Sequence, residues 1–223
     1  MENPVKKALL FGASGFIGSY LLRALLEDPG YAQVIAVVRK KPAVEHLKLK
    51  TVVADRDSLP HIQEALEADD VFISLGTTKK KTPDQAEYYR IDHDYPVLAA
   101  RIAREQGAGS VFLVSAVGAN AQSGIFYLRT KGETERDIIA LDFEHTCIFR
   151  PSMIMGEREE HRPTEKALIA LWFLLSPIFA GGLAKYKGME AKDIATAMVN
   201  AAKKPEEKVA ILGWPEINAL LRR

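Results

Sequence analysis

The feature that most constrains the fold is a glycine-rich run near the N-terminus, which directly follows four apolar residues, 8–11. The run reads Gly12-Ala13-Ser14-Gly15-Phe16-Ile17-Gly18. A buried strand that leads into a glycine-rich turn and then into a helix is the arrangement that binds a dinucleotide pyrophosphate. The glycines allow a tight turn and a close approach of the backbone, while the N–H groups at the start of the helix face the phosphates. We therefore predict that residues 12–18 hold a dinucleotide coenzyme.

The composition is that of an ordinary soluble globular protein, and it limits the partners and the compartment. The 223 residues fit one domain, and a net charge of +1 gives no general attraction to nucleic acid. The single cysteine, Cys147, excludes an internal disulfide and lies in an apolar run, where a buried structural thiol is expected. Since the residues before the glycine-rich run leave no room for a secretory signal, we expect a reducing, cytoplasmic location.

Strand-like and helix-like segments alternate along the first two-thirds of the chain. Short apolar runs predict strands at residues 34–38, 50–54, 71–75, 111–115 and 145–149, with a further possible strand at 209–212. Helical patterns occupy residues 16–26, 59–66, 82–106, 128–141 and 192–202, and Thr82 is expected to cap the third of these. Repeated β-α units predict an α/β fold with a doubly wound parallel sheet of the Rossmann type. We expect one domain over residues 1–223, with a small C-terminal appendage in which residues 151–190 form a substrate-side or lid segment.

The residues that follow the predicted strands suggest where the coenzyme lies. After the second strand, an acidic residue would bind the 2′-hydroxyl of NAD, whereas arginine accommodates the 2′-phosphate of NADP. Here Arg39 and Lys40 follow that strand with no acidic residue close by, which favours NADP(H). Asp55, just past the third strand, is placed to meet the adenine. Past the fourth strand, the backbone is expected to pass close to the coenzyme at Leu75, Gly76 and Thr77.

A serine, a tyrosine and a lysine have a spacing that suits hydride transfer. Tyr127 and Lys131 are four residues apart on one face of a predicted helix, and Ser115 ends the fifth predicted strand. The tyrosine hydroxyl would donate a proton to a developing alkoxide, and a nearby ammonium group would lower its pKa. Ser115 would orient a carbonyl oxygen by a hydrogen bond. These three residues are therefore the candidate catalytic group, and Tyr127 and Lys131 are also expected to contact the coenzyme.

Together these motifs resemble the short-chain dehydrogenase/reductase superfamily. More narrowly, the chain resembles the atypical branch that contains the human Tat-interacting oxidoreductase group and its bacterial relatives. The motifs that carry this resemblance are Gly12-Ala13-Ser14-Gly15, Leu75-Gly76-Thr77-Thr78, Asp92-x-Asp94-Tyr95, Tyr127-Leu128-x-x-Lys131-Gly132-Glu133, Phe149-Arg150-Pro151 and Arg158-Glu159-x-x-Arg162-Pro163. The resemblance implies NADPH binding, a catalytic triad of Ser115, Tyr127 and Lys131, and a nicotinamide side lined by Arg150 and Pro151.

The chain departs from the superfamily pattern at one functional position. Many members supply an asparagine to a proton relay from the helix after the fourth strand, and here Asp92 stands in that place. An aspartate would add negative charge beside Lys131, which puts the relay in doubt. Asp94 is two residues further on, and this spacing points the two carboxylates to different faces of a helix.

The sequence allows several interpretations of its histidines, its most apolar segment and its oligomeric state. The five histidines lack the spacing of metal ligands, so no metal site is expected. The most apolar segment, residues 167–180, falls short of a membrane span, which leaves core packing, a dimer contact or peripheral membrane contact. A monomer and a homodimer are both compatible with the sequence.

Three classes of function stay open. They are an NADPH-dependent oxidoreductase acting on a small carbonyl or alcohol, a coenzyme-binding regulatory protein with little turnover, and an isomerase or epimerase that uses the coenzyme transiently. The short chain argues against sugar-nucleotide epimerases, which need a larger substrate lobe, and the identity of the small-molecule substrate is not indicated.

Overall fold

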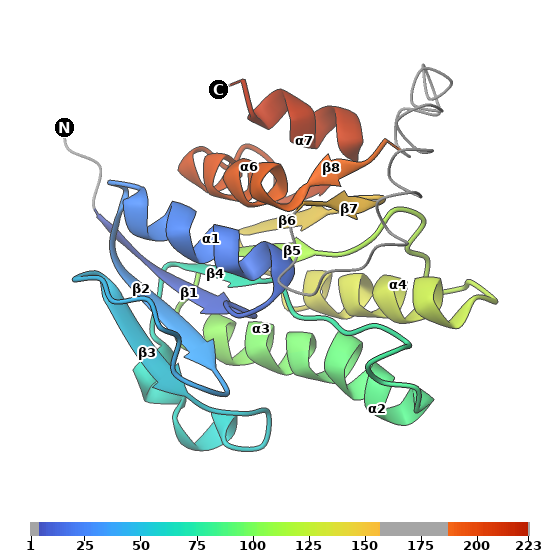
Figure 1. The fold of residues 1–223 in the computed structure, drawn as a ribbon, viewed down its shortest axis with the longest axis horizontal. Helices are drawn as coiled ribbons and strands as arrows, with labels where there is room; N and C mark the ends of the chain where they lie inside the picture. Colours follow the sequence, from blue (N-terminus) through green and yellow to red (C-terminus); the bar gives the residue numbers. More distant parts are fainter. Residues whose placement is uncertain (1–4, 157–186, 223) are drawn as a thin grey trace.

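The computed structural model describes residues 5–156 and 187–222, and it confirms the doubly wound parallel sheet (Figure 1). Seven parallel strands lie in the order β3-β2-β1-β4-β5-β6-β9. The order reverses between β1 and β4, and this switch point is where open α/β sheets bind ligands, beyond the carboxyl ends of the strands. The strands of this sheet are β1 (Lys6–Phe11), β2 (Tyr31–Val38), β3 (Leu49–Val53), β4 (Asp70–Ile73), β5 (Ser110–Val114), β6 (His145–Phe149) and β9 (Val209–Leu212).

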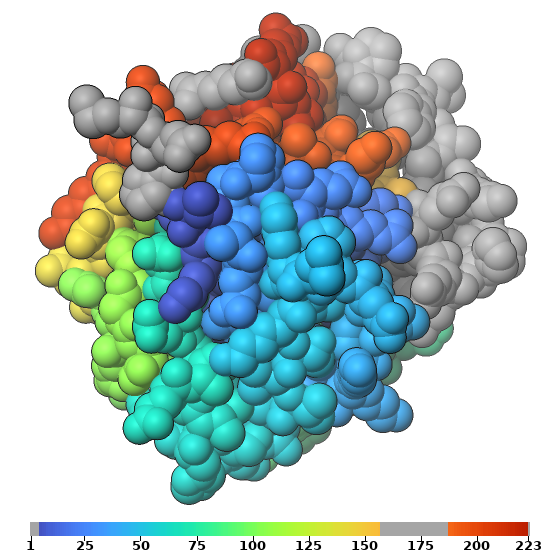
Figure 2. Space-filling model, turned by 90° about the vertical axis from the view of Figure 1, so that its left-hand side faces the viewer, coloured from blue at the N-terminus to red at the C-terminus, as the bar shows by residue number. Residues whose placement is uncertain are grey.

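Helices cover both faces of the sheet. Figure 1 shows α1, α6 and α7 on one face, and α3 and α4 on the other. The helices are α1 (Phe16–Glu27), α2 (Gln85–Tyr89), α3 (Tyr95–Glu105), α4 (Phe126–Ile139), α6 (Ala191–Lys203) and α7 (Trp214–Leu220). Figure 2 looks onto the molecule from the side where β2 and β3 form the edge of the sheet.

The core consists of two apolar layers, one on each face, because successive strand residues point to opposite sides. In β1, Leu10 faces the layer formed with α1 and α6, while Leu9 and Phe11 face the layer formed with α3. Cys147 of β6 lies in the first layer and is buried, which confirms the expected structural thiol. Burial raises the pKa of its thiol to about 12.

The predicted helices at residues 59–66 and 82–106 were only partly correct. Residues 59–66 form two short 3₁₀ turns, Leu59–His61 and Gln63–Leu66, in place of an α-helix. The second helix begins at Gln85, since Asp84 rather than Thr82 caps it: the N–H of Glu87 donates to Asp84 Oδ1 over 2.8 Å. Thr82 instead pairs with the hydroxyl of Thr77 at 2.9 Å.

In the described residues of the C-terminal third, a small sheet, α6, α7 and the strand β9 follow β6. The parallel strands β7 (Ile154–Met155) and β8 (Met189–Glu190) pair beside the main sheet, and they were not predicted. Residues 157–186 of the predicted substrate-side segment, with the apolar run at 167–180, lie outside the described residues. Within the described part of the chain, no helix combines the length and the apolar character that crossing a membrane requires.

Candidate coenzyme-binding and catalytic site

The glycine-rich turn between β1 and α1 leaves no space for side chains. Gly12 has a φ of +89°, and a Cβ there would lie 2.7 Å from the carbonyl oxygen of Ser74 at the end of β4. A Cβ on Gly18 would overlap the carbonyl oxygen of Gly12, so the first turn of α1 packs directly on the loop. Gly15 is the N-cap of α1 and offers no side-chain cap. The N-terminal turn of α1 lines the cleft, and the positive end of a helix fits a phosphate group.

A cleft of about 570 Å³ runs along this turn and joins it to the other predicted functional residues. It is bounded by α1, the loop after β4, the end of β5, and α4. The predicted residues that line it are Ser14, Gly15, Phe16, Ile17, Leu75, Gly76, Thr77, Ser115, Tyr127 and Lys131. Further lining residues that the sequence did not single out include Tyr20, Arg23, Ser74, Lys81 and Ile154.

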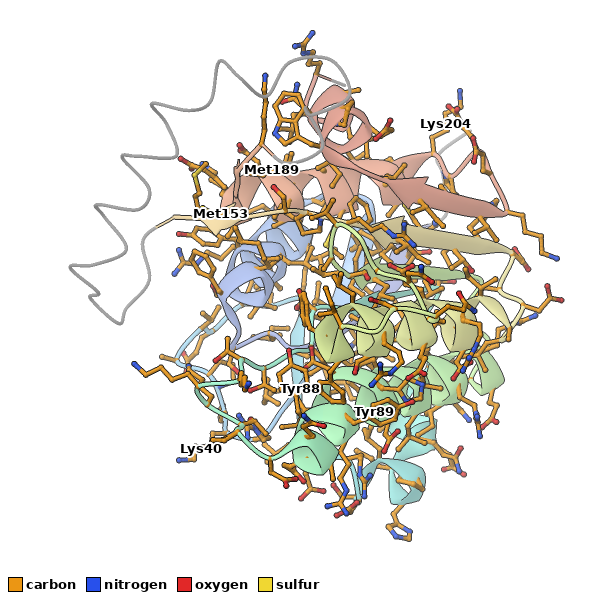
Figure 3. The ribbon with its side chains drawn as sticks, turned by 90° about the vertical axis from the view of Figure 1, so that its right-hand side faces the viewer. Lys40, Tyr88, Tyr89, Met153, Met189 and Lys204 are labelled. Carbon is orange, nitrogen blue, oxygen red and sulfur yellow. The ribbon has the colours of Figure 1, made fainter. Side chains whose placement is uncertain are left out.

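Arg39, Lys40 and Asp55 lie outside this cleft, on the β2 and β3 side of the switch point. Lys40 projects from the surface, whereas Tyr88 lies further in (Figure 3). Arg39 and Asp55 both act on the pKa of the half-buried Tyr95, which burial and the Asp55 charge raise and the Arg39 charge lowers. Both charges therefore lie close enough to Tyr95, the first residue of α3, to act on its hydroxyl. The Asp55 carboxylate also accepts hydrogen bonds from the backbone N–H and the hydroxyl of Ser58, at 2.9 and 2.7 Å.

Lys131 is held by Asp92 in a buried ion pair. Lys131 Nζ lies 2.9 Å from Asp92 Oδ1, and the two side chains are 9% and 1% exposed. The other oxygen, Oδ2, accepts the backbone N–H of Thr77 over 2.7 Å. Asp92 therefore connects α4 to the loop after β4, on the floor of the cleft.

Asp92, the partner of Lys131, lies in a short segment where the helix type changes. Residues Arg90–Asp94 form a π-helical turn between α2 and α3. Pro96 follows two residues later and has no N–H to donate to the carbonyl oxygen of Asp92, four residues before it. That oxygen lies 2.9 Å from the hydroxyl of Thr134 on α4, whose one proton is shared with the carbonyl oxygen of Thr130 at 2.8 Å. Asp94, in contrast, points to the other side, where it contacts His93 at 2.9 Å.

Tyr127 extends into the cleft from the first turn of α4 and is 42% exposed. Partial burial raises the pKa of its hydroxyl above 10; the charge of Lys131 lowers that pKa, and the charge of Asp92 raises it. Lys131 therefore lowers this pKa as expected, but burial outweighs it and the net direction is upward. The charge of Asp92 adds a smaller contribution, which partly offsets the ammonium charge beside the tyrosine.

Ser115 is bound to a buried carboxylate that the sequence analysis did not identify. Its hydroxyl donates to Glu135 Oε1. Arg150 Nε donates to the same oxygen over 2.9 Å, and Arg150 Nη2 pairs with Oε2. The Arg150 side chain thus turns toward Glu135, and neither Arg150 nor the buried Pro151 lines the cleft as the structure describes it.

The sequence did carry a signal for Glu135. Tyr127, Lys131 and Glu135 follow one another at intervals of four, which places all three on one face of α4. Along this stripe the residues become more buried, from the exposed Tyr127 to Glu135 at 3%. Asp92 was recognised as a departure, and its ion pair with Lys131 confirms the negative charge that was expected beside this lysine.

Comparison with known proteins identifies the class that this fold and cleft define. Residues 12–205 match the model of a family described as NAD(P)H-binding, and the chain belongs to this family. It is 37% identical to "Protein fmp52, mitochondrial" of Aspergillus fumigatus over 223 residues, 93% of this chain and 95% of that protein. It is 34% identical to "Protein FMP52, mitochondrial" of Eremothecium gossypii over 97% of both chains.

Solved structures with the same fold include sugar-nucleotide enzymes. The Bordetella bronchiseptica enzyme WbmH in complex with NAD⁺ has a TM-score of 0.70 at 17% identity, covering 97% of this chain and 79% of that one. UDP-glucose 4-epimerase from Thermotoga maritima, solved with UDP-glucose, has a TM-score of 0.68 at 17% identity, covering 97% and 81%. These likenesses establish the Rossmann-type fold alone.

The relatives also correct the expected location. A cytoplasmic protein was predicted, but the relatives from Aspergillus fumigatus and Eremothecium gossypii are both named as mitochondrial. The prediction rested on the lack of a secretory signal and on cysteine usage. Neither observation distinguishes the cytoplasm from another reducing compartment.

Proposed function

We propose that this chain is an NADP(H)-dependent oxidoreductase of the short-chain dehydrogenase/reductase type, acting on a small carbonyl or alcohol. The observation that carries the proposal is the single cleft that brings the glycine-rich turn together with Ser115, Tyr127 and Lys131. The closer resemblance to the Tat-interacting oxidoreductase group belongs to the same proposal.

The glycine-rich turn fits the pyrophosphate of such a coenzyme. The space that a Cβ at Gly12 or Gly18 would fill is taken by backbone, and the N-terminus of α1 has no acidic residue in its first turn. Bound NADP(H) would supply or accept the hydride. Tyr127 would move a proton to or from the substrate oxygen, and Lys131 would hold the ribose hydroxyls. Ile154 lines the cleft, which supports a substrate-side role for the 151–190 segment.

The proposed preference for NADP(H) rests on Arg39, because no acidic residue stands at the end of β2 to bind a ribose 2′-hydroxyl. Calorimetric titration of both coenzymes tests it. The unchanged chain should bind NADPH more tightly than NADH, and Arg39→Asp should reverse that order. Lys41→Asp, two residues further along, is the matched control and should keep the order. Equal affinities of the unchanged chain for both coenzymes would contradict the preference.

The proposed chemistry is tested by Tyr127→Phe together with a screen of aldehydes, ketones, quinones and alcohols for coenzyme turnover. Loss of turnover with retained coenzyme binding is expected, because only the proton donor is removed. Unchanged turnover in the variant would remove Tyr127 from the mechanism.

A second candidate function is a coenzyme-binding regulatory protein with little turnover. The ion pair between Lys131 and Asp92 and the raised pKa of Tyr127 favour it, since both weaken the proton donor at neutral pH. The same screen separates the two functions. Tight NADPH binding without turnover of any compound would favour the regulatory protein, and steady turnover would favour the enzyme. Transient use of the coenzyme by an isomerase stays open as a third possibility.

A further inference from the structure

The hydrogen bond from Ser115 to Glu135 has a direction that the contacts determine. A serine hydroxyl carries one proton and two lone pairs, whereas a carboxylate can only accept. Both oxygens of Glu135 accept N–H groups of Arg150, which is the two-pronged geometry of a guanidinium paired with a carboxylate that only accepts hydrogen bonds. The single proton of Ser115 therefore points to Glu135, as the donor in that bond.

The arrangement is rigid, because three separate elements contribute to it. Ser115 directly follows β5, Glu135 is in α4, and Arg150 directly follows β6. Ser115 is 5% exposed and Glu135 is 3% exposed, while the Ser115 backbone N–H donates to the carbonyl oxygen of Phe149 over 2.7 Å. A buried charge that is paired in this way is costly to rearrange, because breaking the pair leaves an uncompensated charge.

We infer that Glu135, held by Arg150, is a positioning residue that turns the proton of Ser115 away from the cleft, so that Ser115 offers the substrate a hydrogen-bond acceptor. This inference rests on the proposed function and deepens it. It reverses the role that the sequence analysis gave to Ser115, which was to donate a hydrogen bond to a carbonyl oxygen.

The consequence concerns the class of ligand. A hydroxyl group can donate to Ser115, whereas a carbonyl oxygen placed at the same point meets the lone pairs of Ser115 and gains no hydrogen bond. The site therefore binds the alcohol form of a substrate in preference to the carbonyl form. Tyr127, which also lines the cleft, is then the residue that donates a hydrogen bond to a carbonyl oxygen.

A matched pair of probes, cyclohexanol and cyclohexanone, tests this inference by direct binding. Each is titrated into ¹⁵N-labelled protein while the amide signal of Ser115 is followed, with NADPH present for the alcohol and NADP⁺ for the ketone. Neither combination can react. Ser115→Ala keeps the Glu135–Arg150 pair and removes the hydroxyl, which is both the donor to Glu135 and the acceptor in the cleft. The variant should lose about fivefold to tenfold in affinity for the alcohol, on the order of one neutral hydrogen bond, and keep its affinity for the ketone.

Glu135→Gln provides the second variant. The Gln amide can donate to Ser115, which frees the Ser115 proton to face the cleft, so the preference should move toward the ketone by a similar factor. Glu133→Gln on the same helix is the matched control and should leave the preference unchanged. The double variant Ser115→Ala/Glu135→Gln should show the preference of Ser115→Ala alone, because Glu135 acts through Ser115.

The opposite pattern, a loss of ketone affinity in Ser115→Ala, would overturn the inference, and so would an absence of binding of either probe. Failure of the proposed function is recognised separately, from a lack of coenzyme binding or of turnover. If no coenzyme binds, the same titrations on the chain alone still decide the role of Ser115.

Discussion

Lys131 and Asp92 form a buried ion pair in which Lys131 Nζ and Asp92 Oδ1 are 2.9 Å apart, directly beneath the cleft that Tyr127 enters. The pair brings a negative charge to the place where the tyrosine mechanism needs a positive one. The two charges therefore have opposite effects on Tyr127: Lys131 lowers the pKa of its hydroxyl, and Asp92 raises it.

Replacing Asp92 by Asn should make Tyr127 easier to ionise. Asp92 raises the pKa of Tyr127, so its removal lowers that pKa and leaves the charge of Lys131 unopposed. In the direction that needs tyrosinate as the base, activity rises with pH, and its midpoint should move to lower pH in Asp92→Asn. The measurement is the pH dependence of kcat/KM for alcohol oxidation, with Asp94→Asn as the control because Asp94 points to His93. An unchanged midpoint in Asp92→Asn would show that Asp92 does not act on Tyr127.

Gly132 should be intolerant of any side chain. A Cβ there would overlap the backbone of Asn120 and Ala121, so the loop after β5 packs directly against α4. Backbone atoms cannot move aside as a side chain can. Gly132→Ala should therefore lower the free energy of unfolding by about 1–3 kcal/mol, the typical cost of overpacking a core. Urea denaturation measures this cost. Gly124→Ala is the matched control, since a Cβ there meets no atom within 4 Å, and equal stabilities of the two variants would contradict the prediction.

Cys147 should be inert toward thiol reagents while the protein is folded. Its pKa of about 12 leaves almost no thiolate at pH 8, and only 8% of its surface is exposed. Incubation with a chromogenic disulfide should label the native chain only as fast as it unfolds, and the urea-denatured chain completely within minutes. Rapid labelling of one thiol per native chain would contradict the burial of Cys147.

The parts of the structure that depend on local pattern could be predicted from the sequence. The strands of the sheet follow from short apolar runs, and the coenzyme turn follows from Gly12, Gly15 and Gly18, because these signals are contained in a few adjacent residues. The partners of Ser115 could not be predicted in the same way. Glu135 contacts Ser115 from α4, 20 residues further along the chain, and Arg150, which follows β6, contacts Glu135.

Helix type was the other limit of the sequence analysis. A helical pattern over residues 82–106 does not distinguish an α-helix from an α-helix interrupted by a π-helical turn, since both keep apolar residues on one face. Asp92, which pairs with Lys131 in the cleft, lies within this turn. Pro96 is the local signal, because a proline inside a helical pattern removes one backbone donor.

The link between Pro96 and Thr134 gives the last prediction. Thr134 Oγ1 lies 2.9 Å from the carbonyl oxygen of Asp92, the oxygen that an N–H at residue 96 would otherwise reach. Thr134→Val removes that donor at a buried site, so it should cost about 1–3 kcal/mol of unfolding free energy. Pro96→Ala restores a backbone N–H at residue 96, and in that background Thr134→Val should cost less. Urea denaturation of the two single variants and the double variant measures this coupling, and additive costs would show that the Asp92 carbonyl does not depend on Thr134.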